Sequence, residues 1–457
     1  MPDKAAVHVV GAGGAGMNAI AAVLLSMGHQ VSGSDLRESA GVNRLRSMGA
    51  KIDIGHDEAN IGDAEIICRS TAVPDSNVEV EAARELGRSV WSRADVLSAI
   101  CKQKKTIAVS GTHGKTTTSS MLALALTAAG LDPSFIVGGD LNEIGSGAVW
   151  NNKGQLFVVE ADESDGTFVR LNAEATVVTN IEADHLDFFG SYESLVDSFE
   201  KFVADAKGPR VICVDDPGAA NIASIVGECV TYGRSSVADY RIIDIENHRY
   251  SSTFGIMNGT RLIGRCELPV PGVHNVLNAT AAFVAALELG ASAELVLAAL
   301  GRFAGVARRF EFRGEQRGVV YVDDYAHLPS EVSSVLAAAK AGNWNRVVAV
   351  FQPHRYSRTA ELWRDFADSF VDADHVVVTG IYGAGEVPRP GVTGDLLVRA
   401  ILDAHPKASV AYLPGREEVA EYLDANLQSG DLCLTMGAGD LTSVADEVQT
   451  RRKVSDL

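Results

Sequence analysis

Residues 106–118 read Thr-Ile-Ala-Val-Ser-Gly-Thr-His-Gly-Lys-Thr-Thr-Thr, and this stretch decides the fold. It starts as a short β-branched run, which is typical of a buried strand, and continues into two glycines and a helical segment that stops near Gly130 and Pro133. A glycine-rich turn between a strand and a helix presents backbone N–H groups at the helix N-terminus, where anions bind. The stretch therefore predicts a nucleotide phosphate loop.

The loop has its own variant of the usual phosphate-binding pattern. G-x-x-x-x-G-K-[ST] starts with glycine where this chain has Val109, so the first glycine comes later, at Gly111. We expect Lys115 to reach the β/γ-phosphates and the Thr116 hydroxyl to ligate Mg²⁺ or Mn²⁺. The residues expected to contact ATP here are Gly111, Thr112, His113, Gly114, Lys115, Thr116 and Thr117. The alternative is an ordinary strand–turn–helix junction that contains a lysine.

Acidic residues and a histidine follow two further strands of the same block. The run 156–160 ends at Glu160 and leads into Asp162 and Asp165, and the run 176–180 leads into His185. Ligands of open α/β sheets bind at the carboxyl ends of the strands, so both segments should face the phosphate loop. We expect one metal on Thr116 and Glu160 and another near His185. For Asp162 and Asp165, a solvated acidic loop is the competing interpretation.

The whole chain alternates short β-branched runs with Ala/Leu-rich helical stretches, which indicates parallel α/β sheets. Three blocks are expected, at 1–98, 99–306 and 307–457, and only the polar tail 451–457 is expected to lack order. The predicted strands are 7–10, 30–34, 65–68, 106–110, 156–160, 176–180, 210–214, 319–322, 346–351, 375–379, 409–413 and 431–435, with a strand-rich patch at 231–270 and a helix at 275–289.

A second glycine-rich turn lies near the N-terminus. Residues 11–16 follow the strand 7–10, and Asp35 ends the next strand. In form this is a dinucleotide fingerprint, which would indicate a nicotinamide-dependent oxidoreductase. Such a turn needs only a ligand with a diphosphate, which binds at the helix N-terminus, so a UDP-sugar fits equally well.

Composition narrows the class of protein. With 40 basic and 59 acidic residues the net charge is −19, and the chain has no basic stripe, so nucleic acid is an unlikely partner. Six scattered cysteines form no C-x-x-C pair, which argues against a zinc site or disulfide framework. We find no signal-peptide pattern and no apolar stretch of ~20 residues, so we expect a cytoplasmic protein without stable membrane association.

Taken together, these motifs and others further along the chain resemble those of the Mur ligases, in the same order over nearly the whole length. The segments that carry the resemblance are 11–17, 32–35, 111–118, 160–165, 180–187, Gly272-Val273-His274-Asn275-Val276-Leu277-Asn278-Ala279, Arg308-Arg309-Phe310, Asp323-Asp324-Tyr325-Ala326-His327 and Phe351-Gln352-Pro353-His354-Arg355-Tyr356-Ser357-Arg358.

The resemblance implies a Rossmann-like UDP-sugar domain, a central P-loop ATPase-type domain and a Rossmann-like C-terminal domain. It is closest to members that join L-alanine to the carboxylate of UDP-N-acetylmuramate in peptidoglycan synthesis, through an acyl phosphate and with release of ADP. The resemblance implies catalytic roles for Lys115, His185, Arg308, His327, Arg355 and Arg358, and metal binding by Thr116, Glu160 and His185. It implies that the adenine side of ATP is bound by His274, Asn275 and Asn278, and that the amino acid is bound by Tyr325, His327, Arg355 and Arg358. It implies that the UDP-sugar is bound by Gly11, Gly13, Gly14, Ala15, Gly16, Asp35 and Ser70.

The chain departs from the family pattern in two places. Members often carry a second histidine where this chain has Leu328, to which we assign no role. Some carry a carbamylated lysine where residues 195–199 contain none, and Lys201 is offset, so we predict no carbamate. A ligase that adds a recovered tripeptide to UDP-N-acetylmuramate, the nicotinamide enzyme and a nucleotide-gated binding module remain as alternatives, and the oligomeric state stays open between monomer and dimer.

Overall fold

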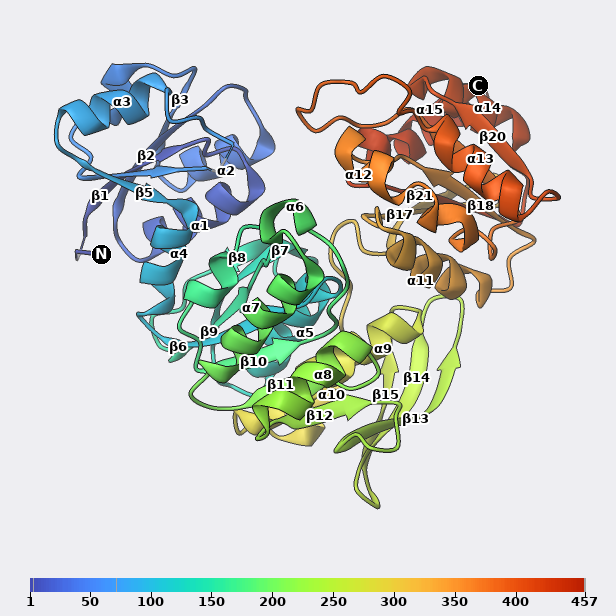
Figure 1. Cartoon of the computed structure of the whole chain (residues 1–457), viewed down its shortest axis with the longest axis horizontal. Coiled ribbons are helices and arrows are strands. Elements are labelled where there is room, and N and C mark those ends of the chain that lie inside the picture. The colour runs from blue at the N-terminus through green and yellow to red at the C-terminus, as the bar shows by residue number, and fades with distance from the viewer. Residues whose placement is uncertain (3, 71, 456–457) are drawn as a thin grey trace. The chain divides into compact units, whose positions relative to one another are not determined.

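The N-terminal part of the chain forms a five-stranded parallel sheet with the strand order β3-β2-β1-β4-β5. It belongs to a computed structural model, which describes residues 1–2, 4–70 and 72–455 (Figure 1). The elements are β1 Ala6–Val10, α1 Ala15–Ser26, β2 Gln30–Asp35, α2 Ala40–Ser47, β3 Lys51–Ile54, η1 Glu58–Ile61, β4 Ile66–Arg69, α3 Val78–Glu85, β5 Ser89–Ser92 and α4 Arg93–Cys101.

Strand β1 is buried on both faces, which explains its continuous apolar run. Val7 and Val9 pack in one core cluster with residues of α1 and α4. Val10 packs in another cluster, which includes Val80 and Ala83 of α3. Helices therefore cover both faces of this sheet, as in a Rossmann-like domain.

The second sheet has ten strands in the order β15-β14-β13-β12-β11-β10-β6-β9-β7-β8. Its centre is parallel, with β6 between β9 and β10, whereas the edge strand β8 runs antiparallel to β7. The elements are β6 Lys105–Ser110, α5 Lys115–Ala128, β7 Ser134–Leu141, β8 Ser146–Val149, β9 Leu156–Glu160, η2 Thr167–Arg170, β10 Ala175–Val178, α6 Leu186–Phe189, α7 Tyr192–Ala204, β11 Arg210–Cys213, α8 Pro217–Val226, β12 Val230–Gly233, β13 Tyr240–Asn247, β14 Ser252–Asn258, β15 Arg261–Leu268, α9 Val273–Glu288 and α10 Ala293–Leu300.

The third sheet has six strands in the order β16-β17-β21-β18-β19-β20, and only β16 pairs antiparallel. Along β17, Val320 and Val322 face one core cluster, and Val319 and Tyr321 face the other. The elements are β16 Glu311–Gln316, β17 Val319–Asp324, α11 Pro329–Lys340, β18 Arg346–Phe351, α12 Tyr356–Leu362, η3 Asp365–Asp368, β19 His375–Thr379, α13 Asp395–Ala404, β20 Val410–Leu413, α14 Arg416–Asn426, β21 Asp431–Met436, η4 Asp440–Ser443 and α15 Val444–Ser455.

The expected disorder of the tail from residue 451 is wrong for residues 451–455, which belong to α15. Arg452 explains why the helix continues, since this side chain is only 2% exposed. Its guanidinium donates to Asp424 Oδ1 at 3.0 Å and to the carbonyl oxygen of Leu427 at 3.1 Å. A charged residue in a polar tail thus fixes the last helix on α14.

The chain divides into two compact units. The first comprises residues 1–243, 255–266 and 277–303, and the second comprises residues 244–254, 267–276 and 304–457. Within the described residues, no helix has the length and apolar character needed to cross a membrane. The expected α/β architecture with three sheets is confirmed, and the antiparallel edges β8 and β16 are additions to the expected parallel sheets.

Candidate active site

The phosphate loop joins β6 to α5 and depends on two glycines with left-handed backbone. Gly111 has φ +137°, and Gly114, which caps α5, has φ +80°. A Cβ atom on Gly111 would overlap Thr179 Oγ1 and lie 2.9 Å from the carbonyl oxygen of Asn180, and one on Gly114 would overlap Asn278 Oδ1. Both glycines are therefore required by conformation and by space.

The residues after β10 hold the loop in shape. The backbone N–H of His113 donates to Asn180 Oδ1 at 2.7 Å, and Asn180 Nδ2 donates back to the carbonyl oxygen of His113 at 3.1 Å. Thr179 Oγ1 donates to the same carbonyl oxygen at 2.6 Å. The sequence analysis assigned no role to Thr179 or Asn180. Their position at the end of the strand beside β6 was the available signal.

Lys115 is folded back onto its own loop. Its Nζ donates to the carbonyl oxygens of Gly111 at 2.6 Å and Thr112 at 3.1 Å, and to Glu163 Oε1 at 2.9 Å. The Lys115 side chain is only 13% exposed, so it is largely buried although it belongs to the phosphate loop. The three N–H donors of the ammonium therefore all have acceptors.

The ion pair of Lys115 and Glu163 is largely buried. Burial lowers the pKa of Lys115, but the charges of Glu163 and Asp162 outweigh it and raise that pKa above its ordinary value. Burial also raises the pKa of Glu163, against the lowering effect of Lys115. The raised pKa of Lys115 favours a charged lysine, whereas the raised pKa of Glu163 favours a neutral carboxylic acid. Lys115 is charged, because three oxygen atoms accept hydrogen bonds from its ammonium group.

Two hard oxygen donors meet beside Gly138. A Cβ on Gly138 would lie 2.5 Å from Glu160 Oε2 and 2.9 Å from Thr116 Oγ1, so only glycine leaves room there. Strands β6 and β9 bring the pair together, since Val109 and Glu160 are in register. A carboxylate and a hydroxyl are ligands that Mg²⁺ accepts, and this part of the expected metal site fits the ion.

His185 contacts a different residue. It adopts φ +56° at the start of α6, and its Nε2 lies 3.3 Å from Asp184 Oδ2. Among the described side chains, no group of three or more His, Cys, Asp and Glu residues could hold a metal. The structure thus brings Thr116 and Glu160 together, and the expected metal role of His185 stays a prediction.

The N-terminal glycine-rich turn is tied to the end of β2. The carbonyl oxygen of Ser34 accepts from the N–H groups of Gly11 and Ala12 at 2.9 and 3.0 Å, and Asp35 Oδ2 accepts from the N–H of Gly13 at 2.8 Å. A Cβ on Gly11 would lie 3.4 Å from Ser70 Cβ. The structure therefore gathers Gly11, Gly13, Asp35 and Ser70 at one turn, and Gly14 caps α1 next to Ala15 and Gly16.

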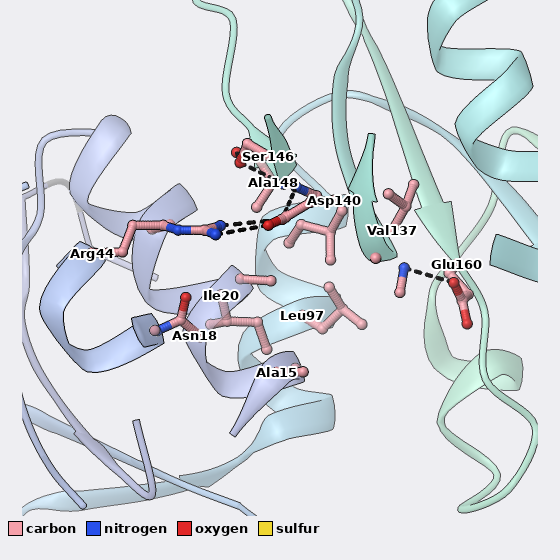
Figure 2. A pocket seen from close by; sticks show the side chains of 18 of the residues that line it. Ala15, Asn18, Ile20, Arg44, Leu97, Val137, Asp140, Ser146, Ala148 and Glu160 are labelled. Carbon is pink, nitrogen blue, oxygen red and sulfur yellow. Dashed lines mark hydrogen bonds and ion pairs between the residues drawn. The ribbon is translucent and has the colours of Figure 1, made fainter. Parts of the chain in front are cut away.

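A cavity of about 490 Å³ has this turn on one side and the phosphate-loop domain on the other. Its walls include Gly13, Ala15 and Gly16 as well as Gly138 and Glu160. Figure 2 shows Ala15 and Asn18 of α1 across from Val137 and Glu160. The glycine-rich turn and Glu160, one of the expected metal ligands, thus line one cavity.

Two arginines in this cavity were missed by the sequence analysis. Arg44 of α2 donates to both carboxylate oxygens of Asp140, at 3.1 and 2.7 Å, as Figure 2 shows. Arg93 of α4 donates to Asp165 Oδ2 at 3.2 Å. Neither arginine stands in a recognisable motif, and their partners are 96 and 72 residues away in sequence, so no local signal marks them.

A buried network supports the glycine-rich turn from below. Glu79 is fully buried and accepts from Ser34 Oγ at 2.6 Å and from Asn60 Nδ2 at 2.7 Å, and His56 Nδ1 lies 3.2 Å away. Burial raises the pKa of Glu79, but the nearby His8, whose Nε2 lies 3.6 Å from Oε2, and hydrogen bonds from Ser34 and Asn60 outweigh it and lower the pKa from 4.5 to about 2. The ionised carboxylate is therefore the form that stabilises the turn.

A low pH should remove the stabilisation that the ionised carboxylate of Glu79 provides. Because the folded-state pKa of Glu79 lies below the ordinary value of 4.5, its stabilisation is present above pH 4.5 and is lost as the pH falls toward 2. The shift corresponds to about 3 kcal/mol. We expect Glu79→Gln to lower the melting temperature at pH 7 and to approach the wild type only as the pH falls to about 2. Calorimetry across this range checks it, and an equal difference at both pH values would contradict it.

A cluster of aromatic and basic side chains lies at the carboxyl ends of β17 and β18, in the second unit. Arg308, with φ +60°, donates through Nη2 to the carbonyl oxygen of Gly437 at 2.6 Å, and its guanidinium carbon lies 4.9 Å from the centre of the Tyr325 ring. The rings of Tyr325 and His327 are 5.5 Å apart. Three residues expected at this site thus lie together.

His354 links the remaining expected residues to this cluster. Its ring is 5.8 Å from that of His327, and its Nδ1 accepts from Arg358 Nη1 at 3.1 Å. Burial, followed by His327 and the nearby arginines Arg358 and Arg355, lowers the pKa of His354 to about 3, so the ring is neutral. His354 belongs to one of the segments that carry the family resemblance, but no role was predicted for it from the sequence. The arginine that follows it, Arg355, was the feature of the sequence that could have drawn attention to it.

The three residues expected on the adenine side, His274, Asn275 and Asn278, all belong to α9. Asn278 lies beside the phosphate loop, where its Oδ1 accepts from Thr118 Oγ1 at 3.2 Å. Asn275 Nδ2 donates to the carbonyl oxygen of Pro271 at 2.8 Å, and His274 lies against Gly272. His274 and Asn275 belong to the second unit, and their role toward a nucleotide stays a prediction.

Comparisons with known proteins agree with this arrangement. Three family models match: Mur ligase family, catalytic domain, at residues 6–105; Mur ligase middle domain, at 109–286; and Mur ligase, glutamate ligase domain, at 308–439. The UDP-N-acetylmuramate–L-alanine ligase of Pelotomaculum thermopropionicum is 44% identical, over 99% of both chains. That of Rubrobacter xylanophilus is 45% identical over 97% of this chain and 99% of the relative.

A solved structure matches over nearly the same length. UDP-N-acetylmuramate–alanine ligase MurC from Thermotoga maritima superposes with a TM-score of 0.84 at 29% identity, covering 98% of this chain and 99% of that one. A murein peptide ligase from Psychrobacter arcticus, at 23% identity and a TM-score of 0.70, shares the fold. The phosphate loop, the shared cavity and these matches over the full set of domains lead to one conclusion: the chain belongs to the Mur ligase family.

Proposed function

We propose that this chain joins L-alanine to the carboxylate of UDP-N-acetylmuramate, with ATP converted to ADP and phosphate. The observation that carries the proposal is the single cavity bounded by the glycine-rich turn and by Gly138 and Glu160. A sugar nucleotide whose diphosphate lies at Gly13–Gly16 would extend its acyl end toward the phosphate loop. The relatives named UDP-N-acetylmuramate–L-alanine ligase, at 44–45% identity, support this choice of substrates.

The first chemical step would form an acyl phosphate. The sugar's carboxylate oxygen attacks the γ-phosphorus of ATP, the bond to the bridging oxygen breaks, and ADP leaves. Lys115 and the N–H groups of the loop would neutralise the charge of the phosphates. Thr116 and Glu160 would hold Mg²⁺, which supplies positive charge to the phosphoryl oxygens when bound.

The second step would form the amide. The neutral amine of L-alanine attacks the acyl carbon to give a tetrahedral intermediate. This intermediate collapses by cleavage of the acyl carbon–oxygen bond, and phosphate leaves while the nitrogen loses one proton to the phosphate or to water. Arg355 and Arg358, with Tyr325 and His327, would hold the amino acid, since an arginine fork suits its carboxylate. The neutral ring of His354 beside Arg358 supports a polar pocket at this place.

The location and the binding partners that we propose follow from the same activity. The use of ATP and the similarity to UDP-N-acetylmuramate–L-alanine ligases support a cytoplasmic enzyme whose partners are these small molecules. The glycine-rich turn would hold UDP rather than a nicotinamide dinucleotide, because Asp35, which would bind a ribose in a dinucleotide site, accepts a hydrogen bond from the turn itself.

Removing the metal should separate the two ligand sites. We expect chelation to abolish ADP release and to leave the dissociation constant of UDP-N-acetylmuramate within about two-fold, because the glycine-rich turn needs no metal to bind a diphosphate. Calorimetric titration of the sugar nucleotide with and without EDTA measures this. Loss of sugar-nucleotide binding in EDTA would contradict the expectation that the glycine-rich turn binds the sugar nucleotide independently of the metal site at Thr116 and Glu160.

A further inference from the structure

Neither the proposed mechanism nor the residue roles that the family resemblance implies include Glu163. It follows β9 by three residues, and its side chain is only 2% exposed. Its Oε1 accepts from Lys115 Nζ at 2.9 Å, whereas its Oε2 is buried and accepts no hydrogen bond from any residue that the structure describes. A buried carboxylate with one satisfied oxygen is costly unless a cation stays with it.

The segment that carries Glu163 is braced from within. The N–H of Ser164 donates to Asp162 Oδ1 at 3.0 Å, the N–H of Gly166 donates to the carbonyl oxygen of Glu163 at 2.9 Å, and the N–H of Thr167 donates to Asp165 Oδ1 at 3.0 Å. Glu163 is thus held toward the phosphate loop by its backbone. Asp165 points elsewhere, since its Oδ2 lies 3.2 Å from Arg93 Nη2.

Lys115 has no free donor in this arrangement. Two loop carbonyl oxygens and Glu163 take its three N–H groups, and Glu163 is the one acceptor among these with a full charge. A phosphate that needs this lysine must replace at least one of the three partners. The carboxylate is the partner whose place an anionic oxygen can take, because both are charged acceptors.

We propose that Glu163 is a positioning residue that occupies the place of a nucleotide phosphate on Lys115 and exchanges with that phosphate when ATP binds and ADP leaves. This inference rests on the proposed function, because it requires a nucleotide at the phosphate loop. Glu163 keeps the lysine ordered while no nucleotide is bound, at the expense of nucleotide affinity. When ADP departs, Glu163 recaptures Lys115, which favours product release.

The test compares two variants that each remove one negative charge from the same segment. Glu163→Gln keeps the shape of the side chain and removes the charged competitor. Asp162→Asn is the matched control, because Asp162 acts on Lys115 only through its charge and makes no hydrogen bond to it. Titration calorimetry with ADP, with Mg²⁺ and with EDTA, gives the affinities, and circular dichroism confirms folding.

The expected result is tighter binding in one variant. Glu163→Gln should bind ADP about three- to ten-fold more tightly than the wild type, with or without Mg²⁺, and the KM for ATP should fall by a similar factor. Asp162→Asn should change the affinity less than Glu163→Gln does. Unchanged or weaker binding in Glu163→Gln would overturn the inference, and weakening only with Mg²⁺ would make Glu163 a metal ligand instead.

A second readout does not depend on affinity. Without nucleotide, Lys115 of Glu163→Gln should react faster with acetic anhydride than Lys115 of the wild type, measured by peptide mass spectrometry against an exposed lysine such as Lys102. Equal rates would overturn the inference. If the wild-type chain binds no ADP at all, the proposed function itself fails, and this outcome is distinct from unchanged binding in Glu163→Gln.

Discussion

Lys115→Met is expected to reduce ADP release by about 10²–10³-fold, because one preorganised charge at a developing anion is worth that much in rate. The substitution keeps most of the unbranched apolar stem and removes the ammonium, with its charge and its three N–H donors. Steady-state kinetics with saturating UDP-N-acetylmuramate and L-alanine measures the effect. A rate within ten-fold of the wild type would contradict the role of Lys115 at the phosphates.

The same substitution should also affect folding, because Lys115 is the counter-ion of Glu163. Leaving a buried carboxylate unpaired costs about 3–5 kcal/mol, so Lys115→Met should melt at a lower temperature than the wild type. The double variant Lys115→Met/Glu163→Gln should recover most of this stability and none of the activity. Recovery of activity in the double variant would show that the rate loss came from unfolding.

Gly111→Ala is expected to abolish nucleotide binding and to lower activity by more than about 10²-fold, since the loop can no longer present its N–H groups. The added Cβ would overlap Thr179 Oγ1 and press against the backbone of Asn180, at 2.9 and 3.0 Å from its oxygen and nitrogen. Backbone atoms cannot move aside as a flexible side chain can, and alanine also disfavours φ +137°.

Gly130→Ala is a control that separates the backbone strain of a positive φ from the steric contact that Gly111→Ala creates. Gly130 follows the other end of α5, has φ +74°, and has no atom within 4 Å of the place of its Cβ among the described residues. This control should cost only about 1–2 kcal/mol of stability, from backbone strain, and keep full activity. Calorimetry and ADP binding compare the pair. Similar behaviour of the two variants would show that contact with Asn180 does not matter.

Local pattern explains what could be predicted from the sequence. The strand 106–110, the glycines of the loop and Lys115 are consecutive, so their spacing alone indicates a phosphate site. Glu160 was predictable for a similar reason, because it ends an apolar run and the carboxyl ends of parallel strands share an edge. Strands such as β16, which is rich in charged residues, carry no such pattern and were missed.

The partners of these residues could not be predicted. The pair of Lys115 and Glu163 spans 48 residues, and that of Arg44 and Asp140 spans 96. Nothing near either end in sequence marks the other, since tertiary packing alone brings them together. The helical tail at Arg452 belongs to the same class, because its acceptors lie on α14.

The most direct measurement is the release of ADP and phosphate by the purified chain with ATP, Mg²⁺, UDP-N-acetylmuramate and L-alanine, with each component left out in turn. We predict release only when all are present, formation of one amide per ATP, and no comparable rate when a tripeptide replaces L-alanine. No release with all components present, beside an active Mur ligase as control, would contradict the proposed function. Release with the tripeptide and not with L-alanine would contradict the choice of substrate.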